Sequence, residues 1–191
     1  LSFLKNRALF FKIIISSLPV LLFGYIMVQT NLIDQLRNIK VIAWTTIIFG
    51  ILLYISDKSK LENKIDNKFN LKTALIIGLF QVLSLIPGVS RSGITITAGR
   101  LLNFKRYDSA KISFLLSVPT LGAISIYGLR NIILSEDLNF SILNFISIIL
   151  SFLFSYLTIK YFLKFIENFS LKLFVIYRIF LGSMLLVLIY L

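Results

Sequence analysis

Residues 87–93 read Pro-Gly-Val-Ser-Arg-Ser-Gly, and they interrupt an apolar stretch that has basic segments on both sides. The apolar halves around them, 73–86 and 94–102, are 14 and 9 residues long. At about 1.5 Å per residue the longer half measures about 21 Å, so neither half crosses a hydrocarbon core of about 30 Å. We therefore expect a hairpin of two half-helices that meet at residues 87–93 and that enter and leave the membrane on one side.

The rest of the chain has the composition of a polytopic membrane protein. Of its 191 residues, 58% are apolar and 15% are charged, which argues against a soluble globular domain. Apolar runs that can cross a membrane as helices lie at 9–28, 41–56, 112–129, 140–159 and 173–190. The predicted fold class is all-α, with about five transmembrane helices and one re-entrant helix-loop-helix hairpin. A single membrane domain is expected, with two spans and a loop in 1–71, the hairpin in 72–111 and three spans in 112–191.

The charges predict how these spans are oriented. Lysine and arginine outnumber aspartate and glutamate by 20 to 8, but they gather in short segments between the apolar runs. This pattern is typical of the cytoplasmic loops of membrane proteins and does not indicate nucleic-acid binding. The segments before the first span, around 58–72, around 100–111 and around 160–172 are therefore assigned to the cytoplasm. The connections at 29–39 and 130–139 are assigned to the opposite side.

Arg91 is the only charged residue between Lys72 and Arg100, and it lies at the turn of the predicted hairpin. An unpaired arginine at this depth costs at least about 2.5 to 3.5 kcal/mol, so we expect it to hold an anion. Its planar guanidinium can bind two phosphate oxygens at once, and Ser90 and Ser92 place a hydroxyl on either side of it.

The neighbouring residues complete the predicted anion site. Gly88 and Gly93 let backbone N–H groups approach the ligand, and the second half-helix directs its positive dipole end to the same place. Thr95 adds a hydroxyl or bonds back to its own helix. The alternative is that Arg91 pairs with a buried acid while the serines pack between helices.

Two further polar residues lie within apolar segments. Arg178 in the last span is either a snorkelling or internally paired arginine, or a substrate contact. Gln81 either faces the cavity of the loop or packs between helices. The chain has no cysteine and no histidine, which excludes thiolate and imidazole metal ligands and any Ser-His nucleophile pair within it.

The loop motif and the segments around it make this sequence resemble the undecaprenyl-diphosphatases of the bacitracin-resistance type. The pattern of that family, Pro-Gly-x-Ser-Arg-Ser-x-x-Thr, is met without departure at residues 87–95. Gly-Leu-Phe-Gln at 78–81 precedes it, Ser-Phe-Leu-Leu-Ser-Val-Pro at 113–119 follows it, and Tyr-Arg stands at 177–178. The resemblance extends over essentially the whole chain.

The resemblance implies hydrolysis of undecaprenyl diphosphate to undecaprenyl phosphate, which recycles the lipid carrier of cell-wall synthesis and gives bacitracin tolerance. It also implies a divalent cation (Mg or Ca), a place in the bacterial plasma membrane, and an active site toward the extracytoplasmic side. The implied partners are an isoprenoid lipid diphosphate and membrane lipids, and a homodimer stays open. The implied catalytic residues are Arg91 and Ser90, and the implied substrate-binding residues are Gly88, Ser90, Arg91, Ser92, Gly93 and Thr95.

The chain departs from the family in one respect. The family carries a second, inverted re-entrant loop near its N-terminus, with a glutamate-containing motif and a Ser-Ser-x-Gly-His-like stretch, and nothing in this sequence corresponds to it. We therefore expect a preceding segment that holds half of the active site, and metal ligands are not identified in this chain. The competing hypotheses are a transporter or lipid flippase with an anion site at the membrane midplane, and an inactive fragment of the phosphatase.

Overall fold

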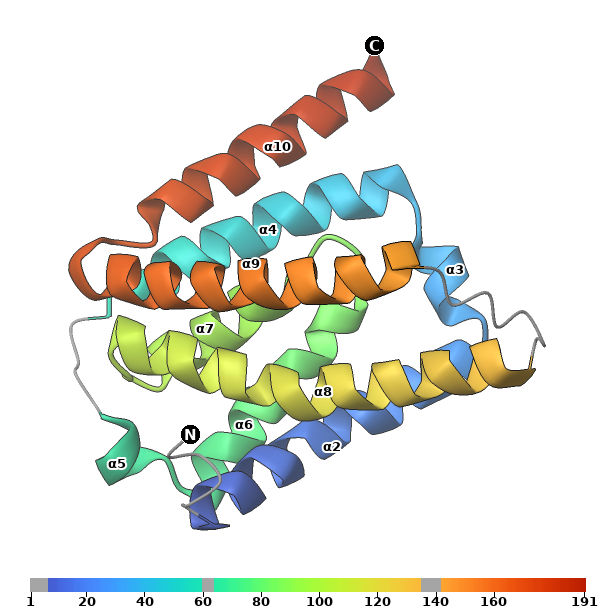
Figure 1. Ribbon diagram of the computed structural model, residues 1–191. Helices are drawn as coiled ribbons and strands as arrows, with labels where there is room; N and C mark the ends of the chain where they lie inside the picture. Colours follow the sequence, from blue (N-terminus) through green and yellow to red (C-terminus); the bar gives the residue numbers. More distant parts are fainter. Residues whose placement is uncertain (1–6, 60–63, 135–141) are drawn as a thin grey trace.

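The computed structural model describes residues 7–59, 64–134 and 142–191, and the regular elements in these ranges are helices (Figure 1). Five helices are long and apolar enough to cross a membrane. They are α2 (Arg7–Gln29), α4 (Ile39–Asp57), α8 (Arg106–Leu134), α9 (Ile142–Asn168) and α10 (Lys172–Tyr190). Two short helices, α3 (Leu32–Leu36) and α5 (Ile65–Lys68), lie between them. The predicted all-α membrane architecture with five spans is confirmed.

The spanning helices are longer than the apolar runs that predicted them. Helix α8 begins at Arg106 instead of residue 112, and α9 continues to Asn168 instead of ending at residue 159. Residues 140 and 141, where the fourth run was predicted to begin, lie outside the described residues. An apolar run marks only the part of a helix that faces hydrocarbon, whereas Lys, Arg and Glu prolong the helix beyond it at little cost.

The predicted hairpin is formed by α6 (Leu71–Val82), the short 3₁₀ helix η1 (Leu83–Leu85) and α7 (Arg91–Leu101). Helix α6 begins with a capping box, in which the Asn70 side chain accepts from the Thr73 N–H and Thr73 Oγ1 accepts from the Asn70 N–H. The two ends of the hairpin meet, since the rings of Phe69 and Phe104 lie 6.3 Å apart, centroid to centroid. The hairpin therefore enters and leaves at one end of the bundle, as its length and charge predict.

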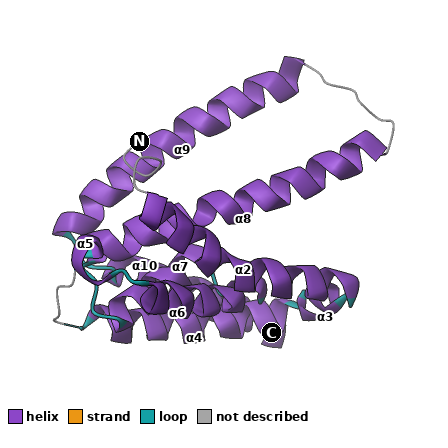
Figure 2. Ribbon diagram, turned by 90° about the horizontal axis from the view of Figure 1, so that it is seen from below, coloured by secondary structure: helices purple, strands orange, loops and turns teal. Residues whose placement is uncertain are grey.

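The hairpin lies between the spanning helices. Helix α6 packs on α2, while α7 packs on α4 and α8. Helix α4 also packs against α10, and α8 against α9. Figure 2 shows α8 and α9 rising away from the other helices. Along α9, 0% of the apolar window is buried inside the protein, as expected of a helix that faces lipid.

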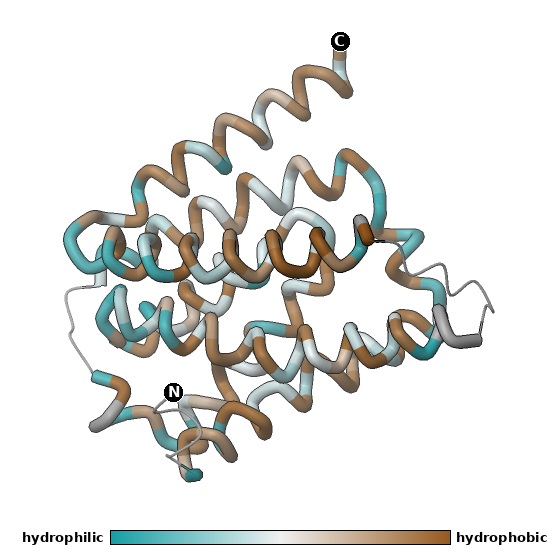
Figure 3. Tube along the Cα trace, viewed as in Figure 1, coloured by the Kyte–Doolittle hydropathy of each residue, from teal (hydrophilic) through white to brown (hydrophobic). Residues whose placement is uncertain are grey.

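The basic segments share one end of the bundle. The Asp57 carboxylate, at the end of α4, accepts hydrogen bonds from Arg106 at the start of α8 and from the Leu171 N–H before α10. Near the start of α2, Lys12 Nζ donates to the Phe69 carbonyl at 2.7 Å. Figure 3 shows hydrophilic residues gathered at helix ends and hydrophobic ones along the spans. This arrangement is the one that the charge pattern predicts, and the assignment of this end to the cytoplasm stays a prediction.

The contact between α2 and α6 gives a testable prediction. A Cβ added at Gly78 would lie 2.0 Å from the Ser16 carbonyl oxygen, a backbone atom that cannot move aside alone. We expect Gly78→Ala to lower the free energy of unfolding by about 1–3 kcal/mol, the usual cost of overpacking. Unfolding by SDS in mixed micelles, followed by circular dichroism, measures this. Gly122→Ala in α8 is the control, because a Cβ there meets nothing within 4 Å; equal stability of the two variants would contradict the packing described.

Candidate anion site at the re-entrant loop

The loop between η1 and α7 is held by its backbone carbonyl groups. From α4, Thr45 Oγ1 donates to the Pro87 carbonyl at 2.7 Å and Thr46 Oγ1 donates to the Gly88 carbonyl at 3.2 Å. Among the described residues, no backbone N–H bonds to either of these two carbonyls, because the backbone here is irregular. Since an unsatisfied backbone group in hydrocarbon costs several kcal/mol, the two threonines allow this turn to exist at membrane depth.

Arg178 of α10 completes the support of the loop. Its Nη2 donates to the Gly88 carbonyl at 2.8 Å, its Nη1 to the Val89 carbonyl at 3.0 Å and its Nε to the Thr46 carbonyl at 3.3 Å. The residue is 7% exposed. Of the two sequence-based interpretations, the structure therefore shows the internally paired arginine, and its partners are carbonyl oxygens of the predicted anion loop.

Two glycines allow this close packing. Gly88 has φ +89°, and a Cβ on it would lie 2.2 Å from Thr45 Oγ1 and 2.6 Å from the Ile42 carbonyl oxygen. A Cβ on Gly93 would lie 2.9 Å from Arg178 Nη1. The sequence predicts that these glycines open the backbone to a ligand; the structure adds that they also allow α4 and the Arg178 side chain to pack closely against the loop.

Ser90 begins the second half-helix. It is the N-cap of α7, and its Oγ accepts from the Gly93 N–H at 3.3 Å, which leaves its hydroxyl proton to donate elsewhere. Its backbone has φ 65° and ψ 114°, a conformation that costs a non-glycine residue on the order of 1–3 kcal/mol. The side chain is exposed while that of Val89 is fully buried. The strained turn thus directs the hydroxyl away from the core.

A cavity of about 290 Å³ lies beside the loop. Its polar wall includes Gly88, Ser90, Ser92 and Gly93, and the guanidinium of Arg178 reaches it as well. Its apolar wall includes side chains of α4, α7, α9 and α10: Leu53, Ile96, Phe162, Phe174 and Leu181. The first N–H groups of α7 have no partner within the helix, so the positive end of its dipole is directed to the polar wall. The cavity is therefore polar and positive at one wall and apolar at the other.

Arg91 lies next to this cavity in the chain, but its side chain takes another direction. The residue is partly buried, and its Nη1 donates to Thr120 Oγ1 of α8 at 3.2 Å. Across the described ranges, Arg91 has no carboxylate within ion-pair distance. The alternative that it pairs with a buried acid is therefore not seen there. The structure places the two serines on the cavity wall and Arg91 toward α8, and the predicted role of Arg91 in binding phosphate stays a prediction.

Thr95 and Gln81 lie deeper in the protein than the loop. Thr95 is 1% exposed, and its Oγ1 lies 2.9 Å from the Arg91 carbonyl and 2.7 Å from Ser113 Oγ. The described structure thus gives this hydroxyl partners within the protein, and its contact with a substrate stays a prediction. Gln81 is fully buried, and its amide has no hydrogen-bond partner in the described part of the chain.

Thr45, Thr46 and Thr120 also contact this loop and were not predicted from the sequence. Each is a hydroxyl residue in an apolar span, and such residues usually bond to the preceding turn of their own helix. Thr45 Oγ1 lies 2.7 Å from the Val41 carbonyl as well as 2.7 Å from the Pro87 carbonyl, so its single proton is shared between the two. The one signal in the sequence is that irregular backbone at membrane depth needs donors from neighbouring helices. That requirement does not say which hydroxyl supplies them.

The divalent cation implied by the resemblance does not fit the residues found here. In the ranges that the structure covers, no group of three or more His, Cys, Asp or Glu side chains could hold a metal ion. No carboxylate is among the described residues that line the cavity, whereas Mg²⁺ and Ca²⁺ bind oxygen ligands, chiefly carboxylates. We therefore derive no chemical step through a metal ion.

Comparisons with known proteins agree with the motif. Residues 3–184 match the model of the family described as bacitracin resistance protein BacA. A protein of Pelagibacter ubique named undecaprenyl-diphosphatase is 54% identical over 188 residues, which are 97% of this chain and 73% of that protein. Proteins with the same name from Saccharophagus degradans and Jannaschia sp. are 41% and 38% identical over 180 residues each, which cover 94% of this chain and 67% of each relative.

The support of the loop by Arg178 can be tested by substitution. Arg178→Gln removes the donors of three carbonyl groups, two of them in the loop, and a buried carbonyl without a partner costs about 1–3 kcal/mol. We expect the free energy of unfolding to fall by at least about 2 kcal/mol in an SDS titration. Arg130→Gln, at an exposed position of α8, removes the same charge and should leave stability unchanged. If both variants unfold at the same SDS fraction, Arg178 does not support the loop.

Proposed function

Because the chain belongs to the family of bacitracin resistance protein BacA, we propose that it hydrolyses undecaprenyl diphosphate to undecaprenyl phosphate and inorganic phosphate. The observation that carries the proposal is the set of charges at the loop. Two arginines, Arg91 and Arg178, lie at the turn of a membrane hairpin, and the described residues around them supply no carboxylate. A diphosphate headgroup would compensate these charges.

The cavity supports a substrate that is both charged and apolar. Its loop wall offers hydroxyl and backbone N–H donors for phosphate oxygens, and its helix wall offers aromatic and aliphatic side chains for an isoprenoid chain. A volume of about 290 Å³ is at the lower limit of ligand pockets. We infer that it takes the diphosphate and the first isoprene units, while the rest of the chain extends into the surrounding lipid.

The residues of the loop act by binding and electrostatic stabilisation. In the proposed reaction water attacks the terminal phosphorus, the bond from this phosphorus to the bridging oxygen breaks, and undecaprenyl phosphate leaves. Negative charge accumulates on the phosphate oxygens, where Ser90, Ser92 and the first N–H groups of α7 donate hydrogen bonds and Arg91 supplies positive charge. The fixed backbone of the loop keeps these donors in place, so they need no reorganisation during the reaction.

We propose the bacterial plasma membrane as the location and the extracytoplasmic side as the opening of the site. The support is the charge distribution, since the hairpin enters from the basic end of the bundle and basic loops stay in the cytoplasm. A turn that reaches inward from the cytoplasmic end is accessible to substrate from the other side.

Phosphate release tests the proposal directly. The full-length protein purified in detergent is expected to release inorganic phosphate from undecaprenyl diphosphate, and Arg91→Ala is expected to lower kcat/KM at least about 100-fold, as loss of an electrostatic donor does. Arg130→Ala, the same change at an exposed position, is the control. Equal rates for Arg91→Ala and the unaltered chain would refute the role of Arg91. Movement of the lipid across vesicles without phosphate release would favour the transporter alternative.

Two substitutions at Ser90 separate the effect of its hydroxyl on activity from the effect of its backbone strain on stability. Ser90→Ala and Ser90→Gly both remove the hydroxyl, but glycine also adopts φ 65° without strain. If the hydroxyl binds substrate, both variants lose activity by about tenfold or more, and Ser90→Gly is the more stable of the two. Full activity of Ser90→Gly would mean that the hydroxyl has no part in the reaction. Initial rates and SDS unfolding of the same preparations give the two readouts.

A further inference from the structure

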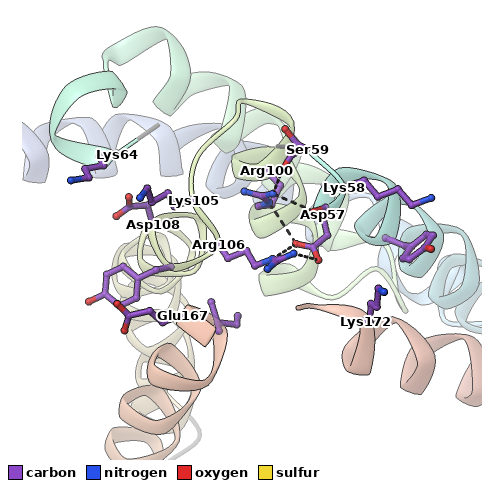
Figure 4. A pocket seen from close by; sticks show the side chains of 13 residues that line it. Asp57, Lys58, Ser59, Lys64, Arg100, Lys105, Arg106, Asp108, Glu167 and Lys172 are labelled. Atoms are coloured by element: carbon purple, nitrogen blue, oxygen red, sulfur yellow. Dashed lines mark hydrogen bonds and ion pairs between the residues drawn. The ribbon is translucent and has the colours of Figure 1, made fainter. Parts of the chain in front are cut away.

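A second and larger cavity, of about 840 Å³, lies at the basic end of the bundle. It is bounded by the end of α4, the segment before α5, the end of α7, the start of α8 and the junction of α9 with α10 (Figure 4). None of its lining residues also lines the cavity beside the loop. Six of its side chains are basic: Lys58, Lys64, Arg100, Lys105, Arg106 and Lys172. Three are acidic: Asp57, Asp108 and Glu167.

The buried base of this cavity holds more positive than negative charge. The Asp57 side chain is 6% exposed, and its carboxylate accepts from Arg106 Nε at 2.7 Å, Arg106 Nη2 at 3.1 Å and the Leu171 N–H at 3.2 Å. Arg100 Nε lies 3.6 Å from the same carboxylate. One carboxylate is thus shared by two guanidinium groups, as Figure 4 shows, and its single negative charge does not balance their two positive charges.

Arg100 is neutralised only in part. Its terminal nitrogens donate to the carbonyls of Phe104, Asp57 and Ser59, which do not neutralise its charge, and its buried Nε has no hydrogen-bond partner among the described residues. Burial lowers the pKa of Arg100 most, Asp57 raises it, and the positive charge of Arg106 lowers it again. An uncompensated buried charge is costly, so this place favours a further anion.

The wall of the cavity adds flexible cations. Lys64 and Lys172 are exposed, and the structure shows no ion pair or hydrogen bond for either side chain within its described ranges. Lys58, at the end of α4, lies over the Tyr54 ring at 4.5 Å. Asp108 and Glu167 also line the cavity, but with Asp57 they are three acidic side chains against six basic ones, which leaves a basic excess. A multiply charged anion with several oxygens can contact the buried guanidinium groups and the lysines together.

We infer that this cavity binds a phosphate group, at a site separate from the loop. Phosphate matches the cavity because its tetrahedral oxygens reach donors on several walls, which a single carboxylate does not. The cavity lies at the ends of five spanning or half-spanning segments, where the headgroups of anionic lipids supply phosphate at high local concentration. The phosphate comes either from such a headgroup or from inorganic phosphate in solution.

Binding is measured in the Arg91→Ala background, which weakens phosphate binding at the loop, and the lysine variants below are compared within that background. The purified protein in an uncharged detergent is titrated with dioctanoyl phosphatidylglycerol, dioctanoyl phosphatidylcholine or inorganic phosphate, and its Tm is followed. A ligand that binds the folded state raises Tm by mass action. We expect phosphatidylglycerol to raise Tm by several degrees and phosphatidylcholine not to do so.

The double variant Lys64→Gln/Lys172→Gln tests the place of binding, because both side chains line the cavity and neither has a described partner. It should need at least five times more phosphatidylglycerol for the same rise in Tm. The matched control, Lys160→Gln/Lys164→Gln, removes the same charge from exposed positions of α9 outside the cavity and should respond like its parent.

Each outcome decides the inference. A rise in Tm with inorganic phosphate alone, weakened by the cavity variant, supports the same site with free phosphate as its source. An equal rise in both lysine variants means nonspecific attraction to a basic surface, and an equal rise with both lipids means binding of acyl chains; either result overturns the inference. No rise with any of the three ligands overturns it as well. The experiment does not use hydrolysis, so it stands apart from the proposed function.

Discussion

Backbone groups inside a membrane must find hydrogen-bond partners within the protein, and the re-entrant loop is where this constraint is hardest to meet. Its solution here is a set of donors from two other helices, with Thr45 and Thr46 from α4 and Arg178 from α10, all bonded to carbonyl groups of residues 87–89. The close approach of α4 and α10 follows from the same need. Gly182 allows it, since a Cβ there would lie 2.9 Å from the Ala43 carbonyl oxygen.

Because the neighbouring helices bond to the carbonyl groups of the loop, the hydroxyl groups of its serines remain available to a ligand. The chain turns through the strained backbone of Ser90 and starts α7 there, so the serine residues and the first turn of α7 line the cavity while Val89 stays in the core. A strained residue persists only when its surroundings hold it. The bonds to Arg178 and the threonines provide that restraint, which links a structural role of α4 and α10 to the geometry of the site.

Positive charge is concentrated at two places in the bundle, the loop and the basic end, and the groups that bond to it differ between them. At the loop, Arg178 donates to carbonyl oxygens and Arg91 donates one hydrogen bond to Thr120, and neither has a carboxylate partner among the described residues. At the basic end, Asp57 joins α4, α8 and the start of α10 through Arg106 and Leu171. The second cluster holds helix ends together, and its excess charge creates a further place for an anion.

The fold class, the five spans and the hairpin were predictable from the sequence, because the length of an apolar run and the charges at its ends are local properties that hydrocarbon thickness constrains directly. The sequence also predicts residues 87–93 as the centre of the site, since a lone arginine between glycines and serines has few other uses at that depth, and this role stays a prediction. Tertiary packing decided which donors hold the loop, that Arg178 bonds to its carbonyls, and that Arg91 and Thr95 face other helices instead of the cavity. These partners are 18 to 90 residues apart in the chain, and no periodicity relates residues on different helices; only the way the helices pack brings them together.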